Sequence, residues 1–476
     1  MDLLSPTYVA FVALAAFFFH ICPERWRSPY LAAVSLTFYS FFSVISAAIM
    51  LLLTLLTWMV AYHVAENRGA RRARFELWAA VGIEASYLAF LKSVPLLQLK
   101  HSTGGLTDFL IGFGTSYYTF KLIGYLLDVY WDQQCPLPFF RLLAITAFFP
   151  QLPAGPIQRT GEFRWVEHGT QLPVLMVDGF RRILLGFVKK MAIADQLGAM
   201  VAMIAGNPHY FSHQQWLLFY LYPAQLYADF SALTDIAIGA AALFGIKSPE
   251  NFALPFFAPN ITQYWRRWHM TLTRWLTDYV FTPLRMLTRD LGEWGLSLSL
   301  TLNMTLIGLW HGFNLGFLLC GLIHACYLIA DALSGSLRRR FYRGHRFLDR
   351  ITDIAGPIIV YHLVALSLVF FRDETVSGSL YTLRHVPVGL VHPMANLSAL
   401  MYSFGRLQSL CALIALSGFC ILEFATLLLT IRLGAGGFRV RFRDLPRPLR
   451  WACYCAAIVG TILLHRQSAE FIYVQF

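Results

Sequence analysis

One histidine lies in a largely apolar segment that could enter a lipid bilayer. His311 is in LIGLWHGFNLGF (306–317), next to Trp310 and between Gly308 and Gly312. An ionisable side chain is costly in such a segment, so it indicates a functional role or a buried hydrogen bond to a backbone carbonyl. The glycines leave room for a helix or a substrate beside the ring. Because a neutral imidazole can take a proton from a hydroxyl near pH 7, His311 is a candidate general base.

A second candidate segment, residues 262–279, combines three tryptophans and three arginines around His269. As one continuous helix it would place the tryptophans on roughly one side and let Arg274 pair with Asp278 at i, i+4. This pattern is typical of an interfacial amphipathic helix. Alternatively, its basic side chains bind a phosphate-bearing ligand or the acidic face of another protein. The candidate substrate-binding residues here are Arg266, Arg267, Trp268 and Arg274.

Two carboxylates, Asp229 and Asp235, are six residues apart in the apolar run YADFSALTDIAIG (227–239). They either pair with basic groups in a structural network or form an acidic lining for a substrate path. Since no catalytic partner adjoins them in the sequence, the structural interpretation is favoured. They remain candidate substrate-binding residues.

The composition indicates the class of protein that must position these groups. Of 476 residues, 57% are hydrophobic and 13% charged, whereas soluble domains carry about 25% charged residues. The chain is therefore predicted to be a polytopic, all-α membrane protein with one integral-membrane domain over 1–476. Its net charge of +12 is typical of basic cytoplasmic loops or of contact with anionic donors and lipids. Its eight cysteines show no paired CxxC spacing, so no metal site or disulfide framework is predicted.

Apolar stretches predict about 11 to 13 transmembrane or re-entrant segments. N-terminal helices fill 1–100, a core with the site motifs fills 105–335, and C-terminal helices fill 350–476. The predicted spans are Thr7–Cys22, Tyr30–Ala65 (two helices with a turn near Ser43), Phe75–Leu97, Thr107–Trp131, Leu142–Pro153, Gly179–Ala205, Trp216–Gly245, Gly292–Phe313, Leu315–Leu333, Ile354–Phe371, Leu407–Ile431 and Trp451–Leu464.

Three arginine runs predict the orientation, because short cytoplasmic loops are enriched in basic residues. The runs lie within 68–74, 338–346 and 439–450. Two predicted spans separate the second from the third, so both fall on one side. With all three runs in the cytoplasm, both termini are predicted to be extracytoplasmic, as is the long 373–405 loop.

Several stretches together resemble the membrane-bound O-acyltransferase (MBOAT) family, specifically its bacterial cell-envelope branch. Two departures from the pattern are Ala232-Leu233-Thr234-Asp235, where relatives usually read GYSD, and Lys121, where Gln is expected. The resembling stretches are GFGTSYYTFKLIGYLLDVY (112–130), FFPQLPAGPIQR (148–159), YADFSALTDIAIG (227–239), PENFALPFFAPNITQYWRRWHMTLTRWLTDYVFTPL (249–284), LNMTLIGLWHGFNLGF (302–317), VFFR (369–372) and FIYVQF (471–476).

The resemblance implies helices around a central tunnel and a bacterial inner-membrane enzyme. It implies transfer of an acyl group, foremost acetyl, from cytoplasmic acyl-CoA or an acyl-carrier protein to a hydroxyl of an exported glycan. Transfer is direct or passes through an extracytoplasmic SGNH-type acyltransferase partner. His311 and His269 correspond to the family's site histidines, and Trp310 and Asn303 are candidate substrate-binding residues. Arg266, Arg267 and Arg274 are expected to hold the donor, through its phosphates or through the acidic face of a carrier protein. No bound cofactor or nucleic acid is implied.

Two alternatives stay open at this point. The chain could transfer D-alanine from a carrier protein to teichoic acid. It could instead be a transporter or channel, with His311, Asp229 and Asp235 forming a pathway, although no inverted repeat is visible. The sequence contains neither a GxSxG nucleophile elbow nor a reactive-cysteine signature, so for an enzyme direct transfer is favoured over an acyl-enzyme.

Overall fold

The computed structural model describes residues 3–94, 114–166, 171–342, 346–373, 375–433, 446–464 and 471–472. Within these ranges the chain is α-helical, and its β pairing is limited to one isolated bridge between Trp165 and Ile246. The predicted all-α class is confirmed. The helices are α1 Pro6–Ile21, α2 Glu24–Ser40, α3 Val44–Glu66, α4 Arg71–Ser93, α7 Thr115–Tyr130, α8 Phe139–Ala147, α9 Gln171–Phe187, the π-helix η2 Val188–Ala194, α10 Asp195–Gly206, α11 Gln215–Leu243, α12 Ile261–Trp265, α13 Met270–Leu276, the π-helix η5 Thr277–Phe281, α14 Thr282–Leu287, α15 Gly292–His311, α16 Leu315–Tyr342, α17 Arg346–Arg372, α18 Val376–Val391, α19 Pro393–Phe404, α20 Arg406–Leu433 and α22 Arg447–Leu463.

Several helices are long and apolar enough to cross a membrane. Five such segments occur in the described ranges, at Val44–Glu66, Ser212–Leu243, Leu315–Gly335, Ile354–Arg372 and Arg406–Leu428. The number and positions agree with a multi-pass membrane protein. The larger total of membrane segments remains a prediction.

The predicted turn near Ser43 is confirmed, and its cause is a helix cap. Helix α2 ends at Ser40, and the Ser43 side chain accepts a hydrogen bond from the Ser46 backbone N–H at 3.1 Å. Serine in this position satisfies a backbone donor that has no partner within the helix. The long apolar run therefore divides into two helices at the residue type that favours a helix start.

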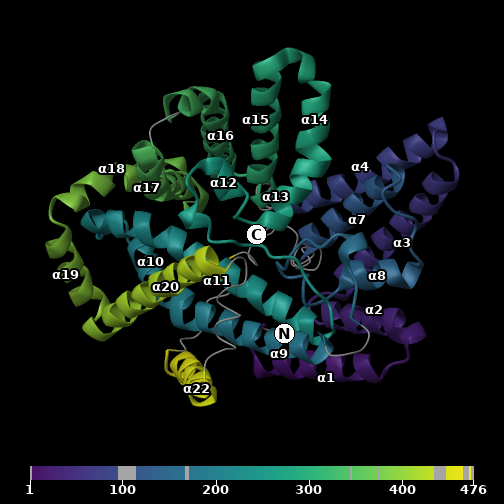
Figure 1. Cartoon of the computed structure of the whole chain (residues 1–476), viewed down its shortest axis with the longest axis horizontal. Coiled ribbons are helices and arrows are strands. Elements are labelled where there is room, and N and C mark those ends of the chain that lie inside the picture. Colours follow the sequence, from purple (N-terminus) through teal and green to yellow (C-terminus); the bar gives the residue numbers. More distant parts are fainter. Residues whose placement is uncertain are drawn as a thin grey trace.

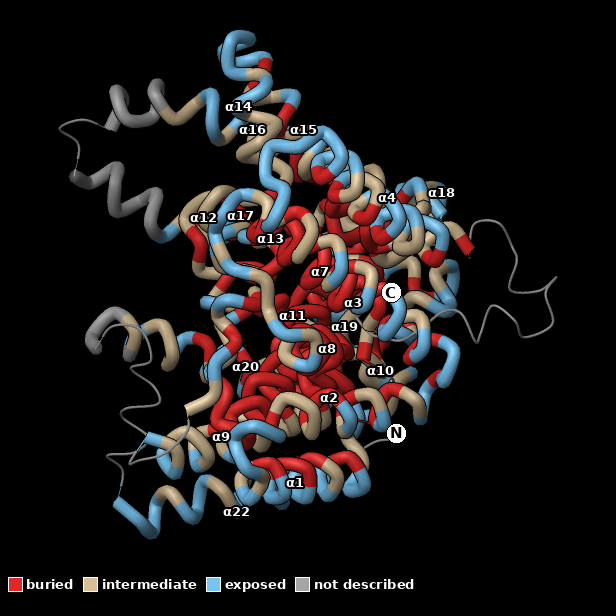
Figure 2. The backbone as a smooth tube through the Cα atoms, turned by 90° about the vertical axis from the view of Figure 1, so that its right-hand side faces the viewer, coloured by how far each residue is buried: buried red, intermediate tan, exposed pale blue. Residues whose placement is uncertain are grey.

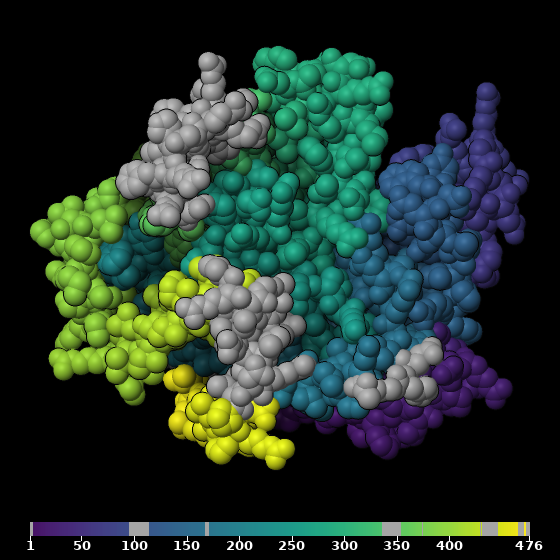
Figure 3. Space-filling view, in the orientation of Figure 1, coloured from purple at the N-terminus to yellow at the C-terminus, as the bar shows by residue number. Residues whose placement is uncertain are grey.

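Helix α11 is the centre of the core, surrounded by buried segments (Figure 2). All of its most apolar 18-residue window is buried inside the protein. Helix α9 packs along it, and a Cβ placed at Gly239 would lie only 2.6 Å from the backbone oxygen of Gly179. Small residues at a helix crossing allow this close backbone approach. The N-terminal helices and α18–α20 occupy opposite sides of the molecule (Figure 3).

Helices α14 and α15 stand side by side at the top of Figure 1, with α16 against α15. Gly308 of α15 and Gly321 of α16 face the partner backbone. A Cβ at Gly308 would clash with the backbone oxygen of Phe317, and one at Gly321 with that of Met304. Gly308 and Gly321 therefore allow the close packing of α15 on α16, which brings α16 side chains next to His311.

The expectation of a long loop at 373–405 is wrong. This stretch forms α18 and α19, and α18 packs on α11. The Gln214 side chain donates to the Asn396 backbone oxygen at 3.1 Å, and the Asn396 side chain donates to that of Gly389 at 2.8 Å. The first of these hydrogen bonds links residues far apart in the sequence, so local composition does not predict the helical pair.

The orientation can be tested with single cysteines placed in a variant that lacks the eight native ones. Asn67 lies in the exposed turn beside the first arginine run, and Ser377 is exposed at the start of α18. Because basic loops stay in the cytoplasm, an impermeant maleimide should label Ser377→Cys in intact cells. Asn67→Cys should react only after permeabilisation, which also serves as the control for reactivity. Labelling of Asn67→Cys in intact cells would show that the predicted orientation is wrong.

Candidate active site

His311 is the last residue of α15 and is buried among aromatic rings. Its ring centroid lies 4.5 Å from that of Trp310, 4.8 Å from that of Phe371 and 5.9 Å from that of Phe317. The three rings come from α15, α17 and α16. Only the packing of these helices could bring them together.

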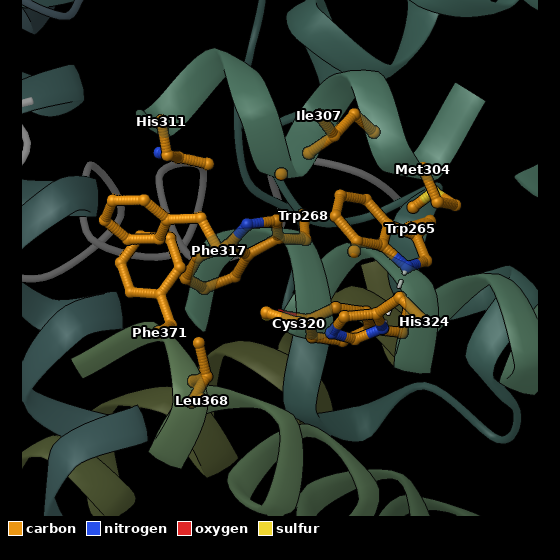
Figure 4. Close-up of a pocket in the computed structure, with 13 residues that line it drawn as sticks. Trp265, Trp268, Met304, Ile307, His311, Phe317, Cys320, His324, Leu368 and Phe371 are labelled. Carbon is orange, nitrogen blue, oxygen red and sulfur yellow. Dashed lines mark hydrogen bonds between the residues drawn. The ribbon is translucent and has the colours of Figure 1, made fainter. Parts of the chain in front are cut away.

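The His311 ring forms part of the wall of a small cavity (Figure 4). The volume open to the centres of water-sized groups is about 40 Å³. One water needs about 10–15 Å³ by this measure, so the cavity has room for roughly three small groups. The lining residues are Tyr264, Trp265, Trp268, Met304, Ile307, Gly308, His311, Phe317, Cys320, Gly321, His324, Leu368 and Phe371. None of these lining residues is a carboxylate, and most are apolar or aromatic.

A second buried histidine, His324 of α16, also lines the cavity, away from His311 (Figure 4). Its Nδ1 accepts a hydrogen bond from Trp265 Nε1 at 3.3 Å, and its Nε2 lies 2.9 Å from Ser367 Oγ. Indole N–H is only a donor, so Nδ1 carries no proton. With both ring nitrogens in hydrogen bonds, His324 holds the Trp265 side chain in its place in the cavity lining.

The expected continuous helix over 262–279 is wrong, because the chain breaks at His269. Helix α12 ends at Trp265, and α13 begins at Met270. His269 between them has φ 43° and ψ 51°, which is the left-handed region. The tryptophans consequently do not share one side. Trp268 stacks on Tyr264 at 5.7 Å, whereas Trp275 donates to the Phe120 backbone oxygen at 2.9 Å.

The break places His269 close to the His311 segment. Its ring lies 5.9 Å from that of Trp310, and Tyr117 of α7 contacts both, at 6.5 Å from His269 and 6.3 Å from Trp310. Trp310 thus contacts both histidines. The structure brings His269, Trp310, His311 and Trp268 into one aromatic cluster.

The arginines of this segment lie apart from the cavity. Arg266 is exposed and forms no ion pair with the described residues, and Arg267 donates to the Phe257 backbone oxygen at 3.1 Å. The expected Arg274–Asp278 pair does not form. Arg274 pairs with Glu162 at 2.7 Å.

Asp278 instead pairs with Arg159. It lies in the π-helix η5, where the wider turn removes the i, i+4 alignment of an α-helix. Arg274 and Asp278 of this segment thus pair with Glu162 and Arg159 of the 159–162 stretch and not with each other.

Asp229 and Asp235 belong to a buried ionic cluster and do not line the cavity. Asp235 Oδ1 lies 2.5 Å from Arg182 Nε, and its Oδ2 lies 2.8 Å from Lys189 Nζ. Lys190 Nζ lies 2.8 Å from Asp229 Oδ1. The two lysines are consecutive in the π-helix η2, and both reach α11. The geometry agrees with the structural interpretation of these carboxylates.

The C-terminal stretch contacts the same cluster. The Ile472 backbone N–H donates to Asp229 Oδ2 at 2.8 Å, and the Phe471 ring lies 4.5 Å from Lys190 Nζ. Residues 473–476 of the FIYVQF stretch lie outside the described residues. Much of the second and third arginine runs lies outside the residues whose side chains are described.

Asn303 is two turns before His311 on α15 and does not line the cavity. Its Oδ1 is buried with no hydrogen-bond partner among the described residues. The sequence analysis missed His324 and also Lys92, whose Nζ lies 5.8 Å from the centroid of the Trp310 ring. Both are ionisable residues in apolar segments, the same signal that selected His311.

Comparison with known proteins decides which class of membrane protein this is. The profile of MBOAT, the membrane-bound O-acyltransferase family, matches residues 136–363, which include His269 and His311. A probable alginate O-acetylase, AlgI, of Pseudomonas aeruginosa is 30% identical over 375 residues, or 75% of this chain and 69% of the relative. The chain belongs to the MBOAT family. It is a multi-pass membrane O-acyltransferase, so the enzyme interpretation replaces that of a transporter or channel.

Two further relatives in the MBOAT family have other acceptors in their names. A peptidoglycan O-acetyltransferase of Helicobacter pylori is 28% identical over 413 residues, covering 77% of this chain and 74% of the relative. A teichoic acid D-alanyltransferase of Bacillus subtilis is 30% identical over 354 residues, covering 67% of this chain and 82% of the relative. Similarity alone therefore does not choose between acetyl and D-alanyl transfer.

Proposed function

We propose that this chain transfers acetyl groups from a cytoplasmic thioester, acetyl-CoA or an acyl-carrier protein, to hydroxyls of an exported cell-envelope polysaccharide. Transfer is direct or passes through an extracytoplasmic SGNH-type partner. The enzyme resides in the bacterial inner membrane, with both termini extracytoplasmic. The observation that carries the proposal is the cavity of about 40 Å³ against the His311 ring.

The size and lining of this cavity support a small, uncharged acyl group. Room for roughly three water-sized groups matches the three non-hydrogen atoms of an acetyl group. A D-alanyl group is larger and carries an ammonium, which is costly to bury without a carboxylate partner. The thirteen lining residues include no Asp or Glu. These features favour acetyl over D-alanyl transfer.

In the proposed reaction His311 is the general base. Its ring takes the proton of the acceptor hydroxyl while the hydroxyl oxygen attacks the thioester carbonyl carbon. The C–S bond then breaks, and the leaving thiolate takes up the proton. The surrounding aromatic rings exclude water, which would otherwise hydrolyse the thioester. Trp310 contacts the rings of both histidines.

The acyl group can be identified from the cell envelope itself. Mild alkali releases ester-linked acetate and D-alanine from isolated polysaccharides, and each can be measured enzymatically. Deletion of the gene should lower acetate and leave D-alanine unchanged, and re-expression of the chain should restore acetate. Loss of D-alanine with unchanged acetate would instead support transfer to teichoic acid and overturn the acetyl assignment.

We expect Arg266 and, to a lesser extent, the half-buried Arg267 to contribute to donor binding. Arg266→Gln removes an exposed cation that has no ion pair among the described residues, so the KM for acetyl-CoA should rise about 2- to 5-fold, the effect of one exposed charge pair. Arg267→Gln should raise this KM by a smaller factor than Arg266→Gln. It should also weaken the hydrogen bond to the Phe257 backbone oxygen. The measurement is acetyl transfer in membrane vesicles at varied donor concentration.

A charge-matched control for this prediction is Arg289→Gln. Arg289 is exposed beside Asp290 in the short 3₁₀ helix before α15 and does not line the cavity. The Arg289→Gln variant should leave the KM for acetyl-CoA unchanged. If Arg266→Gln lowers protein abundance and activity in equal proportion without changing KM, the arginine only anchors the segment.

A further inference from the structure

Asn251 makes an unusual number of contacts with the segment that contains His269. Its side chain is fully buried. Its Oδ1 lies 2.9 Å from Thr271 Oγ1, 3.2 Å from the Thr271 backbone nitrogen and 3.2 Å from His269 Nδ1. Its backbone oxygen accepts from the Met270 N–H at 2.9 Å. One residue thus bonds to three consecutive residues across the break between α12 and α13.

These contacts determine which atom of the amide faces His269. A backbone N–H can only donate a hydrogen bond, so the Asn251 atom that meets the Thr271 N–H must be the oxygen. An amide oxygen only accepts. The hydrogen between Asn251 and His269 therefore belongs to His269 Nδ1.

The state of the other ring nitrogen follows. His269 is buried among the rings of Phe230, Tyr117 and Trp310, an environment that disfavours the charged imidazolium. A neutral imidazole carries a single N–H. With that hydrogen on Nδ1, Nε2 bears the lone pair and can accept a proton or a hydrogen bond but cannot donate one.

Asn251 also stabilises the backbone at His269. The left-handed conformation of His269, with φ 43°, is unfavourable for a non-glycine residue and persists only where the surroundings hold it. The bond from Met270 N–H to the Asn251 backbone oxygen and those to Thr271 fasten the chain directly after His269. Asn251 thus contacts both the ring and the backbone that directs it.

We propose that Asn251 is a positioning residue that holds His269 as the Nδ1–H tautomer, with Nε2 as the proton-accepting nitrogen. This inference rests on the proposed function for its catalytic meaning. It assigns His269 an accepting role toward substrate, and it excludes donation of a hydrogen bond to an oxyanion by Nε2 of the neutral ring.

The tautomer can be read directly by ¹⁵N NMR of the purified full-length chain with ¹⁵N-histidine, since protonated and unprotonated ring nitrogens have well-separated shifts. The His269 signals are assigned by their loss in His269→Gln. In the unaltered protein Nδ1 should be protonated and Nε2 not. Asn251→Asp keeps the accepting oxygen and should keep Nδ1 protonated. Asn251→Leu removes it and should give Nε2–H or a mixture of tautomers.

Thr271→Val is the control for a merely structural role. It removes a hydrogen bond to the same Asn251 oxygen and one from the Ile157 N–H while leaving the contact to His269, so it should lower stability without changing the tautomer. Acetyl transfer per folded protein should fall about 10- to 100-fold in Asn251→Leu, the usual effect of losing a partner that orients a functional histidine. Asn251→Asp should recover most of it.

Two results would overturn the proposal. One is an Nε2–H tautomer in the unaltered protein, which needs no variant to fold. The other is an unchanged Nδ1–H tautomer in folded Asn251→Leu. Because the NMR measurement needs no acyl donor, it stands even if the envelope assay shows no acetyl transfer. Failure of the proposed function is therefore distinguishable from failure of this inference.

Discussion

His311→Ala should abolish acyl transfer to the glycan while the protein stays in the membrane at its normal level. The ring is buried against the cavity that we assign to the acyl group, and loss of a general base costs about 10² to 10⁴ in rate. His311→Gln should be nearly as damaging, because an amide cannot take up the proton. The measurement is ester-linked acetate in the envelope divided by the amount of membrane protein.

The matched control for His311→Gln is His20→Gln. His20 Nε2 lies 2.7 Å from the Leu243 backbone oxygen. Such a hydrogen bond to a backbone carbonyl was the purely structural role considered for His311. Replacement of His20 should preserve transfer per folded protein. Near-normal acetylation by His311→Gln, or a loss that only follows protein abundance, would end the general-base assignment.

Asp235→Asn should strongly destabilise the protein. Its carboxylate bridges Arg182 and Lys189 in the buried interior, and removing one partner of a buried ion pair leaves an uncompensated charge that costs about 3–5 kcal/mol. A lower melting temperature in detergent is expected. Because Asp235 does not line the cavity, the protein that remains folded should transfer acetate at a near-normal rate.

The double variant Asp235→Asn with Lys189→Met should recover much of this stability, since it removes the buried Lys189 cation that Asp235→Asn leaves uncompensated, whereas Arg182 still pairs with Glu250. Asp290→Asn serves as the control, because its pair with Arg289 is exposed and contributes little. Normal stability of Asp235→Asn together with lost transfer would contradict this prediction. That outcome would indicate that Asp235 binds substrate.

The sequence by itself determined the features that depend on local residue type. The low charge content and the apolar runs predicted an all-α membrane protein, and the helices α1, α11, α15 and α20 begin and end near the predicted bounds. The motifs between 249 and 317 predicted the family. Such features follow from the sequence because the cost of placing each segment in a bilayer depends on its own side chains.

Only the tertiary structure decided how the candidate site is assembled. The break at His269 depends on hydrogen bonds that Asn251 accepts, and a periodicity argument cannot include a partner outside the segment. Tertiary contacts likewise bring Glu162, and not Asp278, next to Arg274. They also placed Phe371 of α17 against His311 of α15. Within a membrane, close packing and interhelical hydrogen bonds select such contacts, and the hydropathy pattern of one helix does not specify which residues of another will meet it.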